Sequence, residues 1–281
     1  MSRSSSDHID HIEKLIKSEK KKRKLCIIAG IIALPFLLFF APLGIIILMA
    51  AIIIFFSSTN KLKRVVVPIV MQDVLKEVFQ DYTYHTDDDE TIDIESIDLD
   101  LPHFDSFKID DHIKAKYKDH EIEIIDLELT EKQVTSHKNG SRVRKMIVFL
   151  GPLIKIDHDK TITSSVNISP HDFLSSSDIE TESVRFNEIF EIHADSGHDA
   201  FYILTPQVME RLIFLKDHVL SEIYLDFDVD GHAYLAIDTR RSSFEISFDH
   251  DDIDTMKKEF MIELSKILEI VDRLIEIVDN N

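Results

Sequence analysis

The pattern of apolar and polar residues predicts an α+β protein. In two segments, Val65–Gln80 and Asp251–Val278, hydrophobic residues recur every three or four positions, as in amphipathic helices. Between these segments, short stretches alternate apolar and polar residues with a period of two, which is typical of strands with one buried face. We therefore expect a mostly antiparallel sheet domain with an embedded helix and a long C-terminal helix.

Turn-forming residues separate the predicted strands. Lys118-Asp119-His120, Asn139-Gly140 and Asp230-Gly231 each lie between two such segments and predict hairpins. A bulge or a strand break is expected at Gly151-Pro152, because proline cannot donate a hydrogen bond to a neighbouring strand. The segments predicted as strands or strand pairs are Ile113–Tyr117, Glu121–Leu129, Lys145–Ile156, Thr161–Ile168, Val184–His193, Ile223–Asp238 and Phe244–Phe248.

The two helices of this domain have distinct signals. Thr205 is a good N-cap and Pro206 suits the first helical position, so a helix is predicted from there to about His218. The C-terminal helix has one continuous apolar seam. That seam either closes the core of the domain or pairs with a helix of a partner. Its members are Ile253, Met256, Phe260, Leu264, Ile267, Val271, Leu274 and Val278.

A much longer apolar segment, Leu25–Phe56, precedes the domain. Its 32 residues carry no charge, whereas about 20 helical residues span the hydrocarbon core of a bilayer. Pro42 and Gly44 predict an interruption near the middle of the segment. The two halves, of roughly 15 residues each, would form a transmembrane hairpin that just crosses a thin bilayer. One steeply tilted span is the alternative.

Basic clusters close the apolar segment on both sides, at Lys20–Lys24 and at Lys61–Arg64. Because short loops rich in Lys and Arg stay in the cytoplasm, both ends favour the same side of the membrane, which favours the hairpin. We therefore expect a protein of the bacterial inner (cytoplasmic) membrane, with its soluble domain facing the cytoplasm. The basic collar should attract anionic lipid head groups.

These patterns divide the chain into four regions. Residues 1–24 are expected to form a basic tail, an interfacial helix or a helix continuous with the apolar segment, and residues 25–56 the transmembrane hairpin. Residues 57–110 are expected to be a juxtamembrane helix and an acidic linker, and residues 111–281 the soluble α+β domain. The segment His85–Asp111 contains the acidic run Asp87–Glu90 and is predicted to be a solvated loop with a short edge strand, and a cation site made of its carboxylates is the alternative.

Net charge follows the same division. The chain has 32 basic and 52 acidic residues, a formal charge of −20, and residues 65–281 alone carry −27. An acidic body is repelled by phosphates, so we expect no nucleic-acid partner. The single cysteine, Cys26, leaves the soluble part without disulfides or thiolate metal sites. Cys26 itself is either a buried thiol or a palmitoylation site.

The soluble domain offers few candidates for chemistry. Its sequence lacks the phosphate-binding, dinucleotide-binding, zinc-protease and serine-hydrolase motifs. The segment from Asp226 to Gly231 matches the start of a calcium loop, but Ile237 replaces the final Glu, so a hairpin is favoured. We predict no catalytic, cofactor-binding or metal-binding residues. Two groups of histidines and carboxylates come nearest to a site: His193, Asp195, His198 and Asp199, and then Asp226, Asp228 and Asp230. A basic island is either a solvated turn or a contact for lipid head groups or for an acidic neighbour. It consists of Lys138, Arg142, Arg144 and Lys145.

Several segments together resemble a known family. They are FYILTPQVMERLIFL (Phe201–Leu215), the strand pair AKYKDHEIEIIDLEL, the strand with Phe149-Leu150-Gly151, the Asp230-Gly231 hairpin and the terminal helix. Their order, from about Lys20 to Val278, resembles the bacterial membrane proteins of domain-of-unknown-function family 3137. A glycine that the family usually has near Asp119 is missing here. The resemblance implies a paired membrane anchor before a cytoplasmic α+β domain, and it implies no catalytic residue.

Two classes of function follow. The missing motifs favour a membrane-tethered cytoplasmic interaction or regulatory module without catalytic activity. Its expected partners are the lipid bilayer and a protein, or a second copy, that contacts the C-terminal helix. The alternative is a metal-dependent enzyme that uses carboxylates and histidines around Asp195, His198 and Asp226–Asp230.

Overall fold

The computed structural model describes residues 2–86, 92, 94–137, 140–171, 177–244 and 252–279. The chain divides into two compact units. The helical unit holds residues 1–77 with 246–262, and the sheet unit holds residues 78–245 with 263–281. One helix, α6 (Ile253–Val278), contributes to both units.

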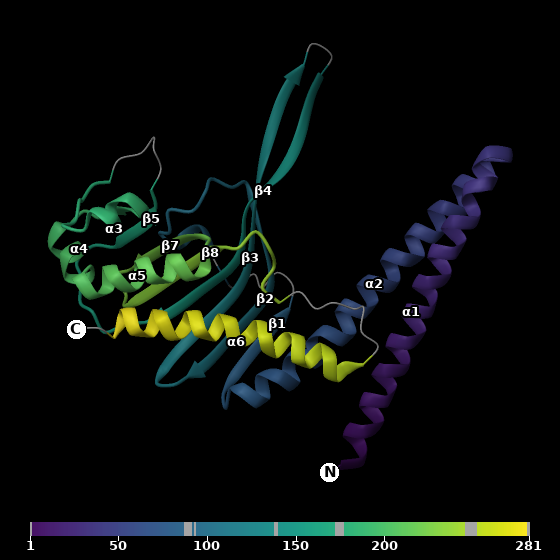
Figure 1. The fold of residues 1–281 in the computed structure, drawn as a ribbon, viewed down its shortest axis with the longest axis horizontal. Coiled ribbons are helices and arrows are strands. Elements are labelled where there is room, and N and C mark those ends of the chain that lie inside the picture. Colours follow the sequence, from purple (N-terminus) through teal and green to yellow (C-terminus); the bar gives the residue numbers. More distant parts are fainter. Residues whose placement is uncertain are drawn as a thin grey trace. The chain divides into compact units, whose positions relative to one another are not determined.

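Two long helices, α1 (Ser2–Phe39) and α2 (Ala41–Val78), make up most of the helical unit (Figure 1). Only Phe40 separates them, so the predicted interruption is confirmed close to Pro42. The Phe40 N–H donates to the carbonyl of Phe36 at 2.7 Å, and the N–H groups of Leu43 and Gly44 donate to the carbonyl of Phe40 at 3.0 and 3.1 Å. The N-terminal residues continue directly into the apolar segment as one helix.

A buried carboxylate joins α1 to α2 near the basic clusters. Glu19 of α1 is only 2% exposed, and it accepts a hydrogen bond of 2.8 Å from the Ser58 hydroxyl of α2. Its carboxylate also lies 2.8 Å from the Lys22 ammonium and 3.5 Å from that of Lys61. The two basic clusters that flank the apolar segment therefore meet at one acidic side chain.

Among the described residues, α2 is the one helix that is long and apolar enough to cross a membrane. The apolar part of α1 is shorter: Leu25–Phe39 has 15 residues, fewer than the roughly 20 that an upright span needs. Large apolar side chains on both helices are exposed, for example Ile31 at 61% and Ile46 at 64%. Exposing such a large apolar surface to water is unfavourable in free energy.

The described strands of the sheet unit form one antiparallel eight-stranded sheet in the order β1-β2-β3-β4-β8-β7-β5-β6 (Figure 1). The hairpins predicted at Lys118-Asp119 and Asp230-Gly231 are confirmed. The strands are β1 (Tyr82–Thr86), β2 (Ser106–Tyr117), β3 (His120–His137), β4 (Gly140–Asp157), β5 (Val166–Pro170), β6 (Phe190–His193), β7 (Glu222–Phe227) and β8 (His232–Asp238).

Helix α5 (Pro206–Val219) and residues 263–278 of α6, which belong to the sheet unit, run along one face of this sheet (Figure 1). The predicted N-cap of α5 is confirmed, because the Thr205 side chain accepts a hydrogen bond from the N–H of Val208. The Arg273 guanidinium of α6 lies 4.6 Å from the centre of the Phe214 ring of α5. Every residue of the predicted α6 seam is buried within the chain. On the sheet face that these helices cover, aliphatic residues of neighbouring strands lie opposite one another and are also buried. They are Ile113, Ile124, Ile154, Leu235, Leu225 and Ile168.

Part of the opposite face is covered by the segment 94–104, which begins with the short 3-10 helix η1 (Ile94–Ser96). Ile94 and Leu99 are buried against the apolar ends of β3 and β4. The Asn167 side chain holds this segment, since its amide donates to the carbonyl of Asp98 and its oxygen accepts from the N–H of Asp100. The expectation of a solvated linker was therefore wrong for residues 94–104, because the isoleucines and leucines between the acids enter the core. The acidic run Asp87–Glu90 lies outside the described residues.

Four further predictions about elements need correction or stay untested. Val184–His193 is not one strand: the Ser183 hydroxyl caps helix α3 (Val184–Ile189), and only β6 is extended. Strand β4 continues through Gly151-Pro152, and the irregularity falls at Val148, opposite Leu129 and Thr130. The turn at Asn139-Gly140 and the strand Phe244–Phe248 fall on residues that are partly outside the described ones. A seven-residue helix, α4 (Gly197–Ile203), precedes α5.

The tight approach of β4 to the end of β8 can be tested at Gly151. A Cβ atom there would lie 2.2 Å from the carbonyl oxygen of Ile237, which is backbone and cannot move aside alone. We expect Gly151→Ala to lower the free energy of unfolding by about 1–3 kcal/mol, measured by circular dichroism during denaturation of the full-length protein. Gly197→Ala is the control, since no atom of the described residues lies within 4 Å of the added Cβ. Equal stability of the two variants would contradict this packing.

Candidate functional site

The histidines and acids around residues 193–199 do not form one site. His193 lies at the end of β6, and its Nδ1 is 3.1 Å from the carboxylate of Asp178. Asp195 and His198 are exposed. The structure thus places these side chains on different elements: His193 ends β6, Asp195 lies between β6 and α4, and His198 lies in the first turn of α4.

Asp199 has a structural contact of its own. Its buried carboxylate accepts hydrogen bonds from the hydroxyl of Thr163 at 2.6 Å and from the N–H groups of Thr163 and Ser164. The bond from the Thr163 hydroxyl is the main cause that lowers the pKa of Asp199 to about 2. Asp199 therefore fixes the chain before β5 to helix α4.

The acids of the β7–β8 hairpin also separate into different roles. Asp228 closes the turn: its carboxylate accepts from the N–H groups of Asp230 at 2.9 Å and His232 at 2.8 Å. It also lies 3.0 Å from Nδ1 of His232. In the part of the chain that the structure describes, no group of three or more His, Cys, Asp or Glu residues could hold a metal ion. The segment that resembles a calcium loop is a hairpin.

Asp226 belongs to a row of polar residues that crosses the whole sheet. Each member is the cross-strand neighbour of the next, and all point away from α5 and α6. We call these residues the polar row. It consists of Thr83, Lys114, Glu123, Lys155, Tyr234, Asp226, Asn167 and His193, from β1 at one edge to β6 at the other.

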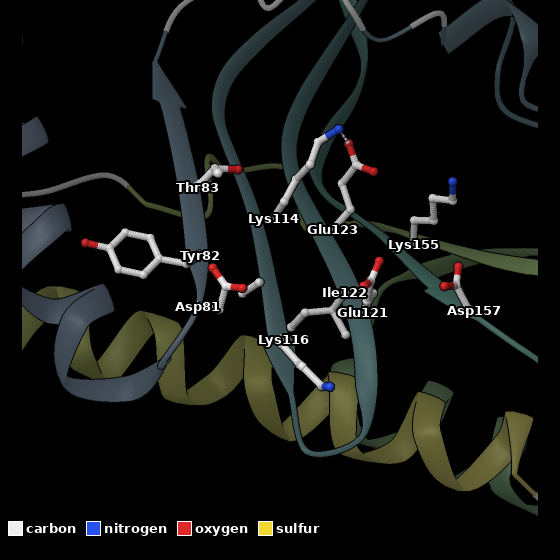
Figure 2. A pocket seen from close by; sticks show the side chains of 11 residues that line it. Asp81, Tyr82, Thr83, Lys114, Lys116, Glu121, Ile122, Glu123, Lys155 and Asp157 are labelled. Atoms are coloured by element: carbon white, nitrogen blue, oxygen red, sulfur yellow. Dashed lines mark ion pairs between the residues drawn. The ribbon is translucent and has the colours of Figure 1, made fainter.

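The β1–β4 half of the polar row lines an open hollow on the sheet face, with a volume of about 300 Å³ (Figure 2). We call this hollow the groove. Both charge signs are present in it, and Lys114 lies 3.3 Å from the carboxylate of Glu123. Lys155 lies over the Tyr234 ring, 5.7 Å from its centre. The charged lining consists of three lysines, Lys114, Lys116 and Lys155, and four carboxylates, Asp81, Glu121, Glu123 and Asp157.

The carboxylate in the middle of the groove is held in its charged form. Burial raises the pKa of Glu123, but the contacts with His112 and Lys114 outweigh that effect, so the pKa lies below its usual range. His112, on β2, is itself buried beside it. Fixed, alternating charges of this kind can bind a partner that presents both charge signs.

Further along the polar row, Asp226 has an unusual environment. Its side chain is fully buried, and among the described residues neither carboxylate oxygen has a hydrogen-bond partner. Burial raises the pKa of Asp226 to about 8, and the nearby carboxylates of Asp98 and Asp228 add to the shift. At neutral pH the folded protein therefore holds Asp226 mostly as the uncharged acid, next to the Asn167 that fixes the segment 94–104.

The sequence pattern gave no signal for this burial. Asp226 alternates with Leu225 and Phe227 in the way an exposed strand residue does. The groove was missed for a related reason, because its lysines and carboxylates come from strands whose register is visible only in the folded sheet.

The raised pKa of Asp226 predicts a specific dependence of stability on pH. An unfolded Asp loses its proton near pH 4, whereas the folded Asp226 keeps it to about pH 8. The free energy of unfolding should therefore fall between pH 4 and 8, by on the order of 5 kcal/mol from this group, because each unit by which the two pKa values differ corresponds to about 1.4 kcal/mol. Asp226→Asn should remove that part of the fall, as measured by denaturant titrations across the pH range. The exposed Asp195→Asn is the control, and an identical pH profile for all three proteins would show that Asp226 is ionised in the fold.

Comparison with known proteins finds a match in the second half of the chain. Residues 147–275 fit the model of a family described as a protein of unknown function, DUF3137. Neither the curated proteins nor the solved structures contain a match to the chain. The matched region runs from β4 through most of α6, so it includes the Phe201–Leu215 segment and the β7–β8 hairpin. From β4 to the C-terminal helix, the chain resembles the DUF3137 family, as its sequence predicts.

Proposed function

We propose that the protein is a membrane-tethered cytoplasmic module of the bacterial inner membrane, which acts by binding a partner and not by catalysis. The observation that carries the tether is the contact of both basic clusters with Glu19. Lys22 precedes the apolar segment and Lys61 follows it, yet both approach the same carboxylate. Two segments that share an ion pair lie on the same side of any membrane between them.

The exposed apolar surface supports the same proposal. Side chains such as Ile31 and Ile46 face outward from α1 and α2, where lipid would cover them. Between Leu25 and Phe56 the two helices carry no charged residue. In a bilayer they form a shallow transmembrane hairpin, and the basic collar contacts anionic head groups. The positive collar orients both ends of the chain toward the cytoplasm.

The topology can be tested with single cysteines in a Cys26→Ser background. Lys21→Cys and Arg64→Cys lie on the two sides of the apolar segment, and both positions are exposed. We expect a membrane-impermeant maleimide to label neither position in intact cells and both after permeabilisation. Asp195→Cys, in the sheet unit, should behave in the same way. Labelling of one flank in intact cells would support the single tilted span and contradict the hairpin.

The groove is the surface that we propose for the binding partner. It lies on the part of the sheet face that is rich in charge, and Lys116 and Glu121 face each other across β2 and β3 there. The pattern of alternating charges suits a protein segment that carries both signs in the complementary order. A segment that places like charges opposite those of the groove would be repelled.

This binding role can be tested by photo-crosslinking in cells. A crosslinking residue at Thr83, which is exposed and lines the groove, should give a protein adduct. The same residue at Val184, which is 72% exposed, is the positional control. The exchange Lys116→Glu with Glu121→Lys keeps the net charge and the cross-strand pair but inverts the pattern, so we expect the Thr83 adduct to fall about tenfold. An adduct of unchanged yield would contradict recognition by the groove.

A further inference from the structure

Strands β3 and β4 extend beyond the rest of the sheet as a two-stranded ribbon (Figure 1). We call residues 131–137 and 140–146 the β3–β4 arm. Within the described residues, β2 pairs with β3 only as far as Thr130, and β8 pairs with β4 only from Leu153 onward. Seven residues of extended strand measure about 23 Å. The arm therefore carries its far end well away from the body of the sheet unit.

The described surface of the arm combines exposed apolar and basic side chains. Val134 and Val143 lie opposite each other and are 63% and 59% exposed. Lys132 and Lys145, the next pair on the same face, also lie directly opposite each other and are exposed. Like charges in such a pair destabilise an isolated ribbon, and exposed valines add no hydrophobic stabilisation to it. The stability of the arm itself therefore does not explain its composition.

The charge of the arm is opposite to that of the body that carries it. Residues 131–146 contain five basic side chains and one acidic side chain, whereas residues 65–281 as a whole carry −27. At physiological ionic strength, electrostatic interactions decay over about 8 Å. The length of the arm is more than twice that distance, so its cations can reach an anionic surface while the acidic body stays out of range.

We propose that the β3–β4 arm is a second lipid contact, which binds anionic head groups of the membrane that holds α1 and α2. Val134 and Val143 enter the interfacial layer, and Lys132, Arg144 and Lys145 contact phosphates around them. The amphiphilic pattern favours lipid over nucleic acid, because a nucleic-acid backbone offers phosphates without an apolar layer. The inference rests on the proposed membrane anchor, since tethering supplies the high local lipid concentration that a short basic ribbon needs.

The contact can be measured with the full-length protein reconstituted into vesicles. In a Cys26→Ser background, an environment-sensitive fluorophore is attached at Val134→Cys, and the vesicles contain a lipid quencher. We expect several-fold stronger quenching in phosphatidylcholine vesicles with about one-third phosphatidylglycerol than in phosphatidylcholine alone, and its loss in 0.5 M salt, since head-group attraction is screened. The same label at Val229→Cys, which is 54% exposed in the β7–β8 turn, should stay unquenched.

A charge reversal separates the arm from general electrostatics. The double variant Lys132→Glu with Lys145→Glu keeps a like-charged cross-strand pair, so the ribbon retains its internal repulsion while the attraction to lipid is lost. We expect this variant to lose the quenching at position 134. The reversal of Arg185 and Lys266, two exposed cations elsewhere on the sheet unit, should leave the quenching unchanged.

The outcomes distinguish this inference from the anchor on which it rests. Protein that floats with the vesicles but shows no quenching at position 134 in anionic lipid overturns the lipid contact and keeps the anchor. Equal quenching in both lipid compositions also overturns it. Protein that fails to float with either vesicle type overturns the anchor itself. A spectral change at position 134 caused by added single-stranded DNA, without one in anionic vesicles, assigns the arm to a polyanion in solution and overturns the proposal.

Discussion

The main-chain pairing of β4 with β8 holds the two halves of the sheet together. β1 to β4 follow one another as neighbours, whereas β5 to β8 form the other half, and the register from Leu153 with Ala236 to Asp157 with His232 joins them. The paired residues are about 80 positions apart, but the entropy cost of closing a loop rises only slowly with its length. Burial of Leu153, Ile154 and Ile156 against both faces offsets that cost.

This register also decides what each face of the sheet can do. On the face turned away from α5 and α6, residues two positions apart along each strand share a side, so Leu153 and Lys155 are neighbours on it. The segment 94–104 covers the apolar end of that face, and the polar row begins where the cover stops. Asp226 lies at this boundary, close enough to Asn167 and Asp98 to be enclosed with them. The burial of Asp226 and the open groove therefore have the same cause: the segment 94–104 covers only part of this sheet face.

Local signals in the sequence were sufficient for much of the fold. Thr205-Pro206 marks the start of α5, the α6 seam follows helical spacing, and Asp230-Gly231 fixes a hairpin, because each of these features depends on neighbours a few residues away. Ser183 was overlooked as an N-cap since apolar residues follow it at strand-like spacing. The acidic residues around Ile94 and Leu99 led to the prediction of a solvated loop, although the apolar residues of this segment enter the core. The candidate site was beyond prediction for a different reason: Lys114, Glu123 and Lys155 become neighbours only through pairing between strands.

The single-residue junction at Phe40 has a consequence for how the proposed anchor would contact lipid. In a hydrocarbon environment every unpaired backbone donor is costly. At this junction the N–H groups of Phe40, Leu43 and Gly44 are bonded within the chain, and Pro42 has no N–H to satisfy. In the proposed transmembrane hairpin, these bonds lower the cost of placing the tip in hydrocarbon. The tip can therefore lie at the far edge of the hydrocarbon core of a thin bilayer, which apolar arms of roughly 15 residues just reach.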